Sequence, residues 1–163
     1  MGMNTQNVHF TKVTRTTATL SIAVSGTPQV MAWEAVIVGG NPFALWVVGS
    51  PNRITIQKNG WYMLSAGVEF AANATGDREI YFNKNGVVTP IGSQGNKSPT
   101  LAGRISTSTF IRLARGEFVE TWVNQTSTAA LNVNTTAAGE TPYFSVTLMR
   151  PDYDFVTSEV IPG

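Results

Sequence analysis

The sequence predicts an all-β protein, built as a two-sheet antiparallel sandwich or jelly roll. Hydrophobic and polar residues alternate at period two in many short stretches, which is the pattern of half-buried β-strands. Gly, Pro, Asn and Asp separate these stretches about every eight to twelve residues, as is typical of sandwiches. No stretch shows the period of a convincing helix. These three observations together favour a protein made of many short strands.

The clearest strand lies within residues 59–70, NGWYMLSAGVEF, which open with an Asn-Gly turn. One face of this strand carries Tyr62, Leu64, Ala66, Val68 and Phe70, and the other carries Trp61, Met63, Ser65, Gly67 and Glu69. A strand facing water would carry Lys or Thr in place of Trp61 and Met63. We therefore expect the second sheet of the domain on one side and a second copy of the chain on the other.

The remaining elements follow from alternation and turn residues. We expect strands at residues 8–24 (one or two strands), 30–38, 43–48, 53–57, 78–83, 87–91, 104–113, 117–125, 131–134 and 142–149. A short helix over residues 31–37 is a less favoured alternative. Asn85-Gly86 predicts a hairpin turn, and residues 72–77 and 92–103 are predicted surface loops. Residues 1–150 form one predicted domain, with residues 1–26 as a candidate extended arm and residues 151–163 as a C-terminal tail.

Several predicted strands carry large side chains on the face opposite their core residues. This set of candidate interface residues comprises Trp61, Met63, Tyr81, Phe118, Trp122, Tyr143 and Met149. Exposed apolar side chains of this kind usually mark an interface. The alternative is that loops of the same subunit, such as residues 30–48, cover this face.

Composition excludes several classes of function. Charged residues make up 13% of the chain and the net charge is +1, with no charged run, which argues against nucleic acid as a partner. Cys is absent, which excludes disulfides and thiol chemistry and favours folding in the cytosol. The N-terminus lacks the pattern of a signal peptide, and the most apolar window, residues 30–49, is too interrupted to span a membrane.

No motif predicts an enzyme or a cofactor. His9 is the only histidine, and no G-x-S-x-G, Walker or Rossmann pattern occurs. Asp77 with Glu79, and Asp152 with Asp154, are weak candidates for calcium ligands because they lack the rest of a calcium loop. A glycan or anion site formed by Arg112, Arg115 and Trp122 is a further hypothesis, with edge salt bridges as its alternative.

Four segments in order resemble the C1q/TNF-like jelly rolls over residues 53–149. Residues 60–64, GWYML, resemble the G-x-Y-x-F strand of that family, and Asn85-Gly86 occupies the place of its N-G turn. Residues 113–119, LARGEFV, resemble its L-x-x-G-D-x-V segment, and residues 144–149, FSVTLM, resemble its closing F-S-G-x-L-L strand. The departures from the family are Leu64 for Phe, Glu117 for Asp and Val146 for Gly.

The resemblance implies a homotrimer with aromatic residues near a threefold axis. Without a collagen-like stalk or Cys, the chain is similar in style to bacteriophage virion proteins made in the host cytoplasm. We therefore expect a capsid decoration or head-fibre protein with capsid or tail partners. The alternative is a tail-fibre module that recognises a host glycan or protein. Candidate docking residues in the tail are Tyr153, Phe155, Val160 and Ile161.

Overall fold

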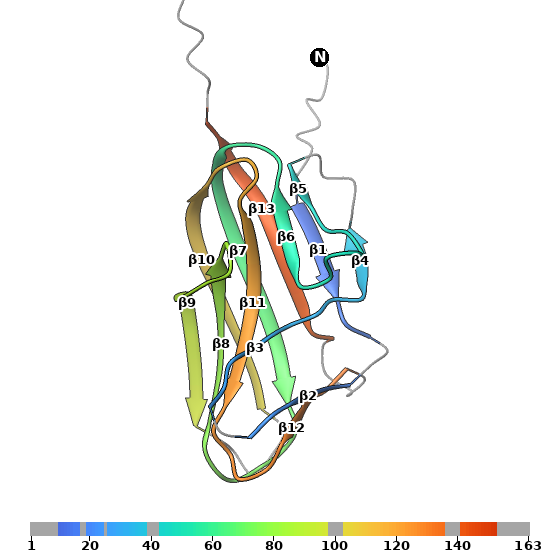
Figure 1. The fold of residues 1–163 in the computed structure, drawn as a ribbon, viewed down its shortest axis with the longest axis vertical. Coiled ribbons are helices and arrows are strands. Elements are labelled where there is room, and N and C mark those ends of the chain that lie inside the picture. Colours follow the sequence, from blue (N-terminus) through green and yellow to red (C-terminus); the bar gives the residue numbers. More distant parts are fainter. Residues whose placement is uncertain are drawn as a thin grey trace, which may run out of the picture.

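The computed structural model describes residues 10–16, 19–24, 26–38, 43–97, 103–135 and 141–152, which form two antiparallel sheets packed face to face (Figure 1). The described residues contain no helix, so the short helix considered for residues 31–37 is not formed. It follows that no helix in this part of the chain is long and apolar enough to cross a membrane. The prediction of an all-β sandwich is confirmed.

The first sheet, sheet A, has the order β2-β12-β7-β13-β1-β4, and β10 pairs with the other edge of β7. Its strands are β1 (Phe10–Thr14), β2 (Leu20–Ile22), β4 (Ala35–Val38), β7 (Gly60–Phe70), β10 (Gly103–Leu113), β12 (Leu131–Val133) and β13 (Tyr143–Pro151). Strand β7 therefore lies between β10 and β13 along most of its length. The strand predicted within residues 59–70 is confirmed.

The second sheet, sheet B, has the order β5-β6-β11-β8-β9, and β3 pairs with part of β11. Its strands are β3 (Gln29–Val30), β5 (Ala44–Leu45), β6 (Arg53–Ile56), β8 (Asp77–Lys84), β9 (Val87–Lys97) and β11 (Phe118–Gln125). The β8–β9 hairpin turns at Asn85-Gly86, where both residues have positive φ as this turn requires.

The core lies between the two sheets and contains the predicted face of β7. Tyr62, Leu64 and Ala66 are fully buried there. From the neighbouring strand, Phe144 contacts Phe82 of sheet B with ring centroids 5.7 Å apart, and Trp33 at 6.0 Å. Burial of such side chains is worth about 2–3 kcal/mol each and is the main force that holds the sheets together.

Three predicted elements are wrong in part. The strand expected at residues 30–38 is two short strands, β3 and β4, because Met31 and Trp33 turn into the core between them. The strand expected at residues 43–48 ends at Leu45. The loop expected at residues 92–103 is β-strand up to Lys97, because β9 continues to pair with β8 beyond two irregularities in register.

Buried polar side chains hold the loops at one end of the sandwich. The Arg78 guanidinium donates to the carbonyls of Asn73 and Thr75, both at 3.1 Å, which fixes the loop between β7 and β8. The Gln125 amide donates to the carbonyls of Ala23 and Ala129 and so joins the segments around β2 and β12. These bonds satisfy the buried Arg78 guanidinium and Gln125 amide, which would otherwise lack partners in the protein interior.

We predict that Gly76→Ala destabilises the fold much more than Gly116→Ala. Both glycines have positive φ, which costs other residues about 1 kcal/mol or more. A Cβ at Gly76 would lie 2.4 Å from the Thr126 backbone, whereas a Cβ at Gly116 would meet nothing within 4 Å. Urea unfolding should show that the free energy of unfolding falls by about 3 kcal/mol for Gly76→Ala and by about 1 kcal/mol for Gly116→Ala. Equal losses would contradict the close approach at Gly76.

We also predict that Glu117 contributes stability that depends on pH. Burial alone would raise the pKa of Glu117, but the Ala114 N–H at 2.8 Å and Lys84 Nζ at 3.0 Å outweigh it and lower the pKa below its usual value near 4.5. The stabilisation is therefore present above that usual value and is lost as the pH falls through the lowered pKa. Glu117→Gln should cost stability at pH 7 and cost less at about pH 3 in urea unfolding. The same cost at both pH values would contradict this assignment.

Candidate functional site: the outward face of sheet A

One unusual feature of the surface is the face of sheet A that points away from sheet B. In the half nearest the start of β7, Trp61, Met63, Phe110 and Met149 form what we call the apolar cluster. Met63 is the direct partner of Phe110 across β7 and β10. The exposed fractions are 36% for Met63, 51% for Phe110 and 56% for Met149. This is far more apolar side chain than a strand face in water needs.

Local geometry makes the apolar cluster an ordered surface. The Trp61 and Phe110 rings stack with centroids 5.1 Å apart and an interplanar angle of 16°. The Arg150 guanidinium lies 6.0 Å from the Trp61 ring centre, within the range of a cation–π contact. A register shift between Leu148 and Arg150 interrupts the pairing of β13 with β7 beside Met149. Such irregularities commonly re-aim side chains.

The other half of the same face is small and rich in hydroxyl groups. Ser65 lies opposite Ser108 on β10 and Ser145 on β13. The hydroxyl oxygens of Ser65 and Tyr143 lie 3.3 Å apart, and the Lys12 ammonium lies 4.9 Å from the Tyr143 ring centre. An open hollow of about 270 Å³ at this place is lined by Ser65, Gly92, Ser93, Ser106, Thr107 and Ser108. The face therefore changes along the strands from apolar to polar.

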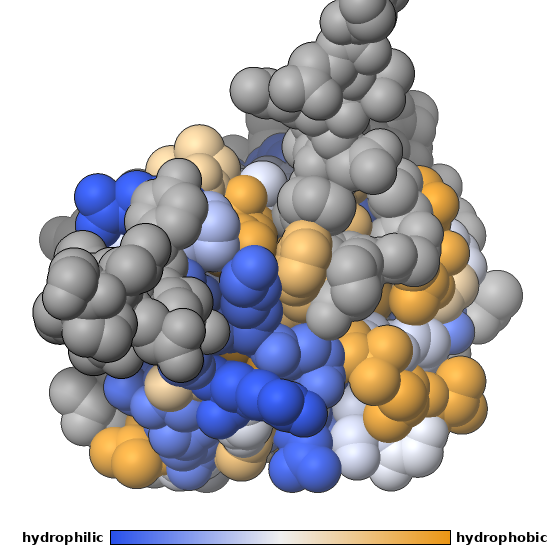
Figure 2. Space-filling view, turned by 90° about the horizontal axis from the view of Figure 1, so that it is seen from above, coloured by the Kyte–Doolittle hydropathy of each residue, from blue (hydrophilic) through white to orange (hydrophobic). Residues whose placement is uncertain are grey.

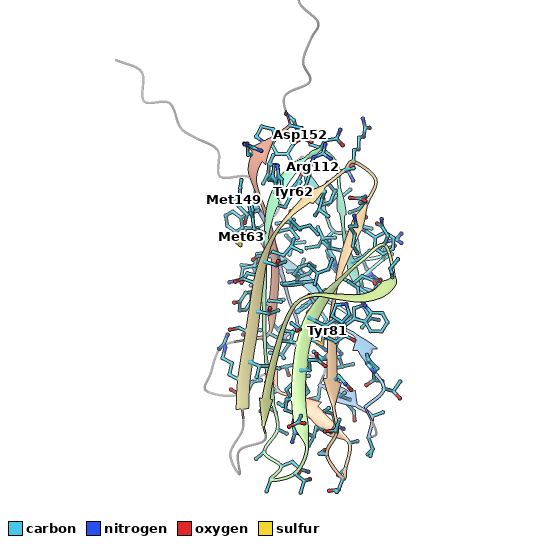
Figure 3. All side chains as sticks on the ribbon, turned by 90° about the vertical axis from the view of Figure 1, so that its left-hand side faces the viewer. Tyr62, Met63, Tyr81, Arg112, Met149 and Asp152 are labelled. Carbon is cyan, nitrogen blue, oxygen red and sulfur yellow. The ribbon has the colours of Figure 1, made fainter. Side chains whose placement is uncertain are left out.

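The structure divides the seven candidate interface residues between two opposite surfaces. Trp61, Met63, Tyr143 and Met149 lie in sheet A, whereas Tyr81, Phe118 and Trp122 lie in sheet B. Figure 3 shows Met63 and Met149 close together on one side of the sandwich, with Tyr81 on the other side. The single surface expected from the sequence is thus two surfaces, because period two within a strand does not say which sheet the strand joins.

The three candidate residues of sheet B are buried or contact other side chains of the same chain. Tyr81 is 2% exposed, and burial, followed by the charge of Glu79, raises the pKa of its phenol. The Trp122 indole N–H donates to the Glu120 carboxylate at 3.1 Å, and the Arg53 guanidinium lies 4.8 Å from the Phe118 ring centre. Tyr81 therefore has no surface to offer a partner, which corrects the prediction for this residue.

Sequence reasoning missed Phe110, which pairs with Met63 and stacks on Trp61 in the apolar cluster. The signal was present, because the outward positions of β10 are Arg104, Ser106, Ser108, Phe110 and Arg112. Among these polar residues Phe110 stands out as the only large apolar side chain. The period-two test applied to the other long strands would have found it.

The other sequence hypotheses meet mixed outcomes. Arg112 lies in sheet A and pairs with Asp152 at 2.7 Å, so it does not form a glycan site with Trp122 of sheet B. In the described residues no three His, Cys, Asp or Glu side chains come together as a metal site would require. His9 and the tail candidates Tyr153, Phe155, Val160 and Ile161 lie outside the described residues.

Comparisons with known proteins show the fold alone. No family model and no curated protein matches the chain. Among solved structures, murine APRIL at pH 8.0 superposes with a TM-score of 0.64 at 10% identity, covering 86% of this chain and 98% of that chain. The Eiger TNF of S. frugiperda superposes with a TM-score of 0.62 at 9% identity, covering 90% of this chain and 96% of that chain. The protein thus has a TNF-like jelly-roll fold, as the sequence motifs predicted.

We predict that the two surfaces respond differently to truncation of a large side chain. Tyr81→Ala should lower the free energy of unfolding by about 3–5 kcal/mol, because it empties a buried site. Met149→Ala should change it by no more than about 0.5 kcal/mol in a dilute, dissociated sample, because that side chain is exposed there. Urea unfolding at low protein concentration measures both values. A small effect at Tyr81 would contradict its placement inside the subunit.

Proposed function

We propose that the protein is a non-enzymatic structural module that assembles as a homotrimer through the outward face of sheet A. The apolar cluster of Trp61, Met63, Phe110 and Met149 is the observation that carries this proposal. Aromatic residues, Met and Arg are enriched where protein surfaces meet, and this face has all three. Around a threefold axis the same residues of three copies come together. One apolar surface on each copy is therefore sufficient to form a homotrimer.

The chemistry of the whole surface supports self-association. Charged residues are few, so the chain has little electrostatic repulsion to keep like copies apart. Among the described residues, the acidic side chains Glu69 and Asp152 lie near the face and already bond to Asn134 and Arg112 of the same chain. Burying them in a contact between copies would therefore leave no carboxylate without a partner.

The setting we propose for this trimer is the surface of a virus particle, as a capsid decoration or head-fibre protein held by capsid or tail proteins. The two ends of the described part support this proposal. Strand β1 begins and strand β13 ends toward the same end of the sandwich (Figure 1). A sandwich held at that end would display its opposite end.

Recognition of a host glycan or protein is the second candidate function. One observation favours it: the loop between β7 and β8 lies at the end of the sandwich opposite to Asp152, beside Lys97 at the end of β9. Arg78 holds this loop through Asn73 and Thr75, so it is ordered before any partner arrives. Ordered loops at the free end of a displayed module suit adhesion.

We predict that Met63→Asp combined with Phe110→Asp abolishes the trimer. Two carboxylates in the apolar cluster would have to be buried at the proposed contact, which costs far more than the contact provides. Light scattering should give about three times 17.5 kDa for the native chain and 17.5 kDa for the variant, with unchanged circular dichroism. Val87→Asp, at an exposed valine of β9 outside the apolar cluster, is the control for an added surface carboxylate and should remain trimeric.

A native mass of 17.5 kDa would contradict the proposed homotrimer. A double variant that remains trimeric would contradict the outward face of sheet A as the contact surface. The setting needs a separate experiment. A particle-associated protein should sediment with particles from an infected culture, whereas a receptor-binding module, labelled and purified, should stain host cells. Staining without sedimentation would favour the second candidate function over the first.

A further inference from the structure

A second apolar surface lies at the edge of the sandwich where β4 and β5 end the two sheets. We call it the edge patch: Val36, Ile37, Leu45, Val47 and Val48. Val48 is 77% exposed and is the most exposed large apolar residue of the described chain. In Figure 2 hydrophobic side chains gather on the right-hand side, which is the side of β4 and β5 in Figure 1.

Hydrogen bonds hold the part of the edge patch that follows β5. Trp46 is buried between Leu45 and Val47, and its indole N–H donates to the Pro51 carbonyl at 3.0 Å. The Ser50 N–H donates to the Val47 carbonyl at 3.0 Å, which closes a turn that presents Val47 and Val48. Thr11 of β1 donates to the Ala44 carbonyl at 2.5 Å and so fixes β5 beside β1, the strand that pairs with β4.

A series of contacts connects Asp152, the last described residue, to the start of β5 beside this patch. The Asp152 N–H donates to the Asn59 carbonyl at 3.0 Å, and its carboxylate is paired with Arg112. The Tyr62 hydroxyl lies 2.6 Å from the Lys58 carbonyl and 3.3 Å from that of Phe43. Lys58 in turn places its ammonium 5.2 Å from the Phe43 ring centre. Asp152 is thus connected through residues 58–59 to Phe43, the residue that precedes β5.

The sequence that follows Asp152 matches this surface in chemistry. Residues 153–163, YDFVTSEVIPG, contain aromatic and branched apolar residues, two carboxylates and no Lys or Arg. Extended, they reach at most about 36–40 Å. Lys58 is exposed beside Phe43, the residue that precedes β5, and offers a cation to the acidic residues. Among the described strands β4 pairs only with β1, and an unpaired strand edge is a place where an extended segment can add.

We propose that residues 153–163 fold back and cover the edge patch of their own subunit. The sequence-based hypothesis sends this segment to a neighbouring copy or a particle, whereas the route from Asp152 leads to a surface of the same chain. The inference is independent of the proposed trimer, because the edge patch and the apolar cluster lie on different parts of the sandwich.

Disulfide trapping tests this directly, because the chain has no Cys and any crosslink must come from introduced residues. Val48→Cys combined with Phe155→Cys is compared with Val87→Cys combined with Phe155→Cys. Both valines are exposed, but Val87 belongs to β9 at the opposite edge. Under mild oxidation we expect at least about tenfold more intrachain crosslink at Val48, because docking raises the effective concentration there. Equal crosslinking at the two sites would overturn the proposal.

A second measurement uses the full chain without introduced thiols. Phe155→Asp combined with Ile161→Asp should speed hydrogen exchange of the amides of residues 44–48 by about fivefold or more, because the segment no longer covers them. Thr157→Asp combined with Ser158→Asp adds the same charge to the same segment and is expected to leave exchange unchanged. Unchanged exchange in the first variant would overturn the proposal. Disulfide-linked dimers in place of the intrachain product would also overturn it and assign the edge patch to a neighbouring copy.

Discussion

The structure depends on the burial of one face of β7 against sheet B. Tyr62, Leu64 and Ala66 have no exposed surface, and the rings of Phe144 and Phe82 close the core beside them. The Tyr62 hydroxyl reaches the Lys58 carbonyl at the mouth of the core, and burial, followed by the charge of Asp152, raises its pKa to about 12. A core residue thus also fixes the end of the sandwich where the chain leaves β13.

The same strand also places large apolar side chains on the outer surface of sheet A. Because side chains alternate along a strand, Trp61 and Met63 must point away from the core once Tyr62 and Leu64 point into it. Phe110 and Met149 extend this surface onto both neighbouring strands. The serine-rich half of the face has no comparable tendency to leave water. Assembly through this face would therefore be strongest at the end where β7 begins.

The sequence was most informative where a strand is long and has a clear period. The core face of β7, the Asn85-Gly86 hairpin and the strands β6 to β8 and β10 to β13 were all predicted. It was least informative around Met31 and Trp33, where tertiary burial outweighs any local pattern. It also failed for Tyr81, because the sheet to which a strand belongs is decided by long-range pairing. The polar residues of β9 looked like a loop because Gly, Ser and Gln carry no period of their own.

The two apolar surfaces of the molecule differ in the elements that form them. The outward face of sheet A spans several strands and carries stacked rings with Arg beside them, as the proposed contact with another copy would require. The edge patch combines exposed valines with β4, whose outer edge pairs with no described strand. Extended segments satisfy such an edge, because their backbone can pair with the strand while alternate side chains cover the apolar residues. The chain carries an apolar, acidic segment of this kind directly after Asp152.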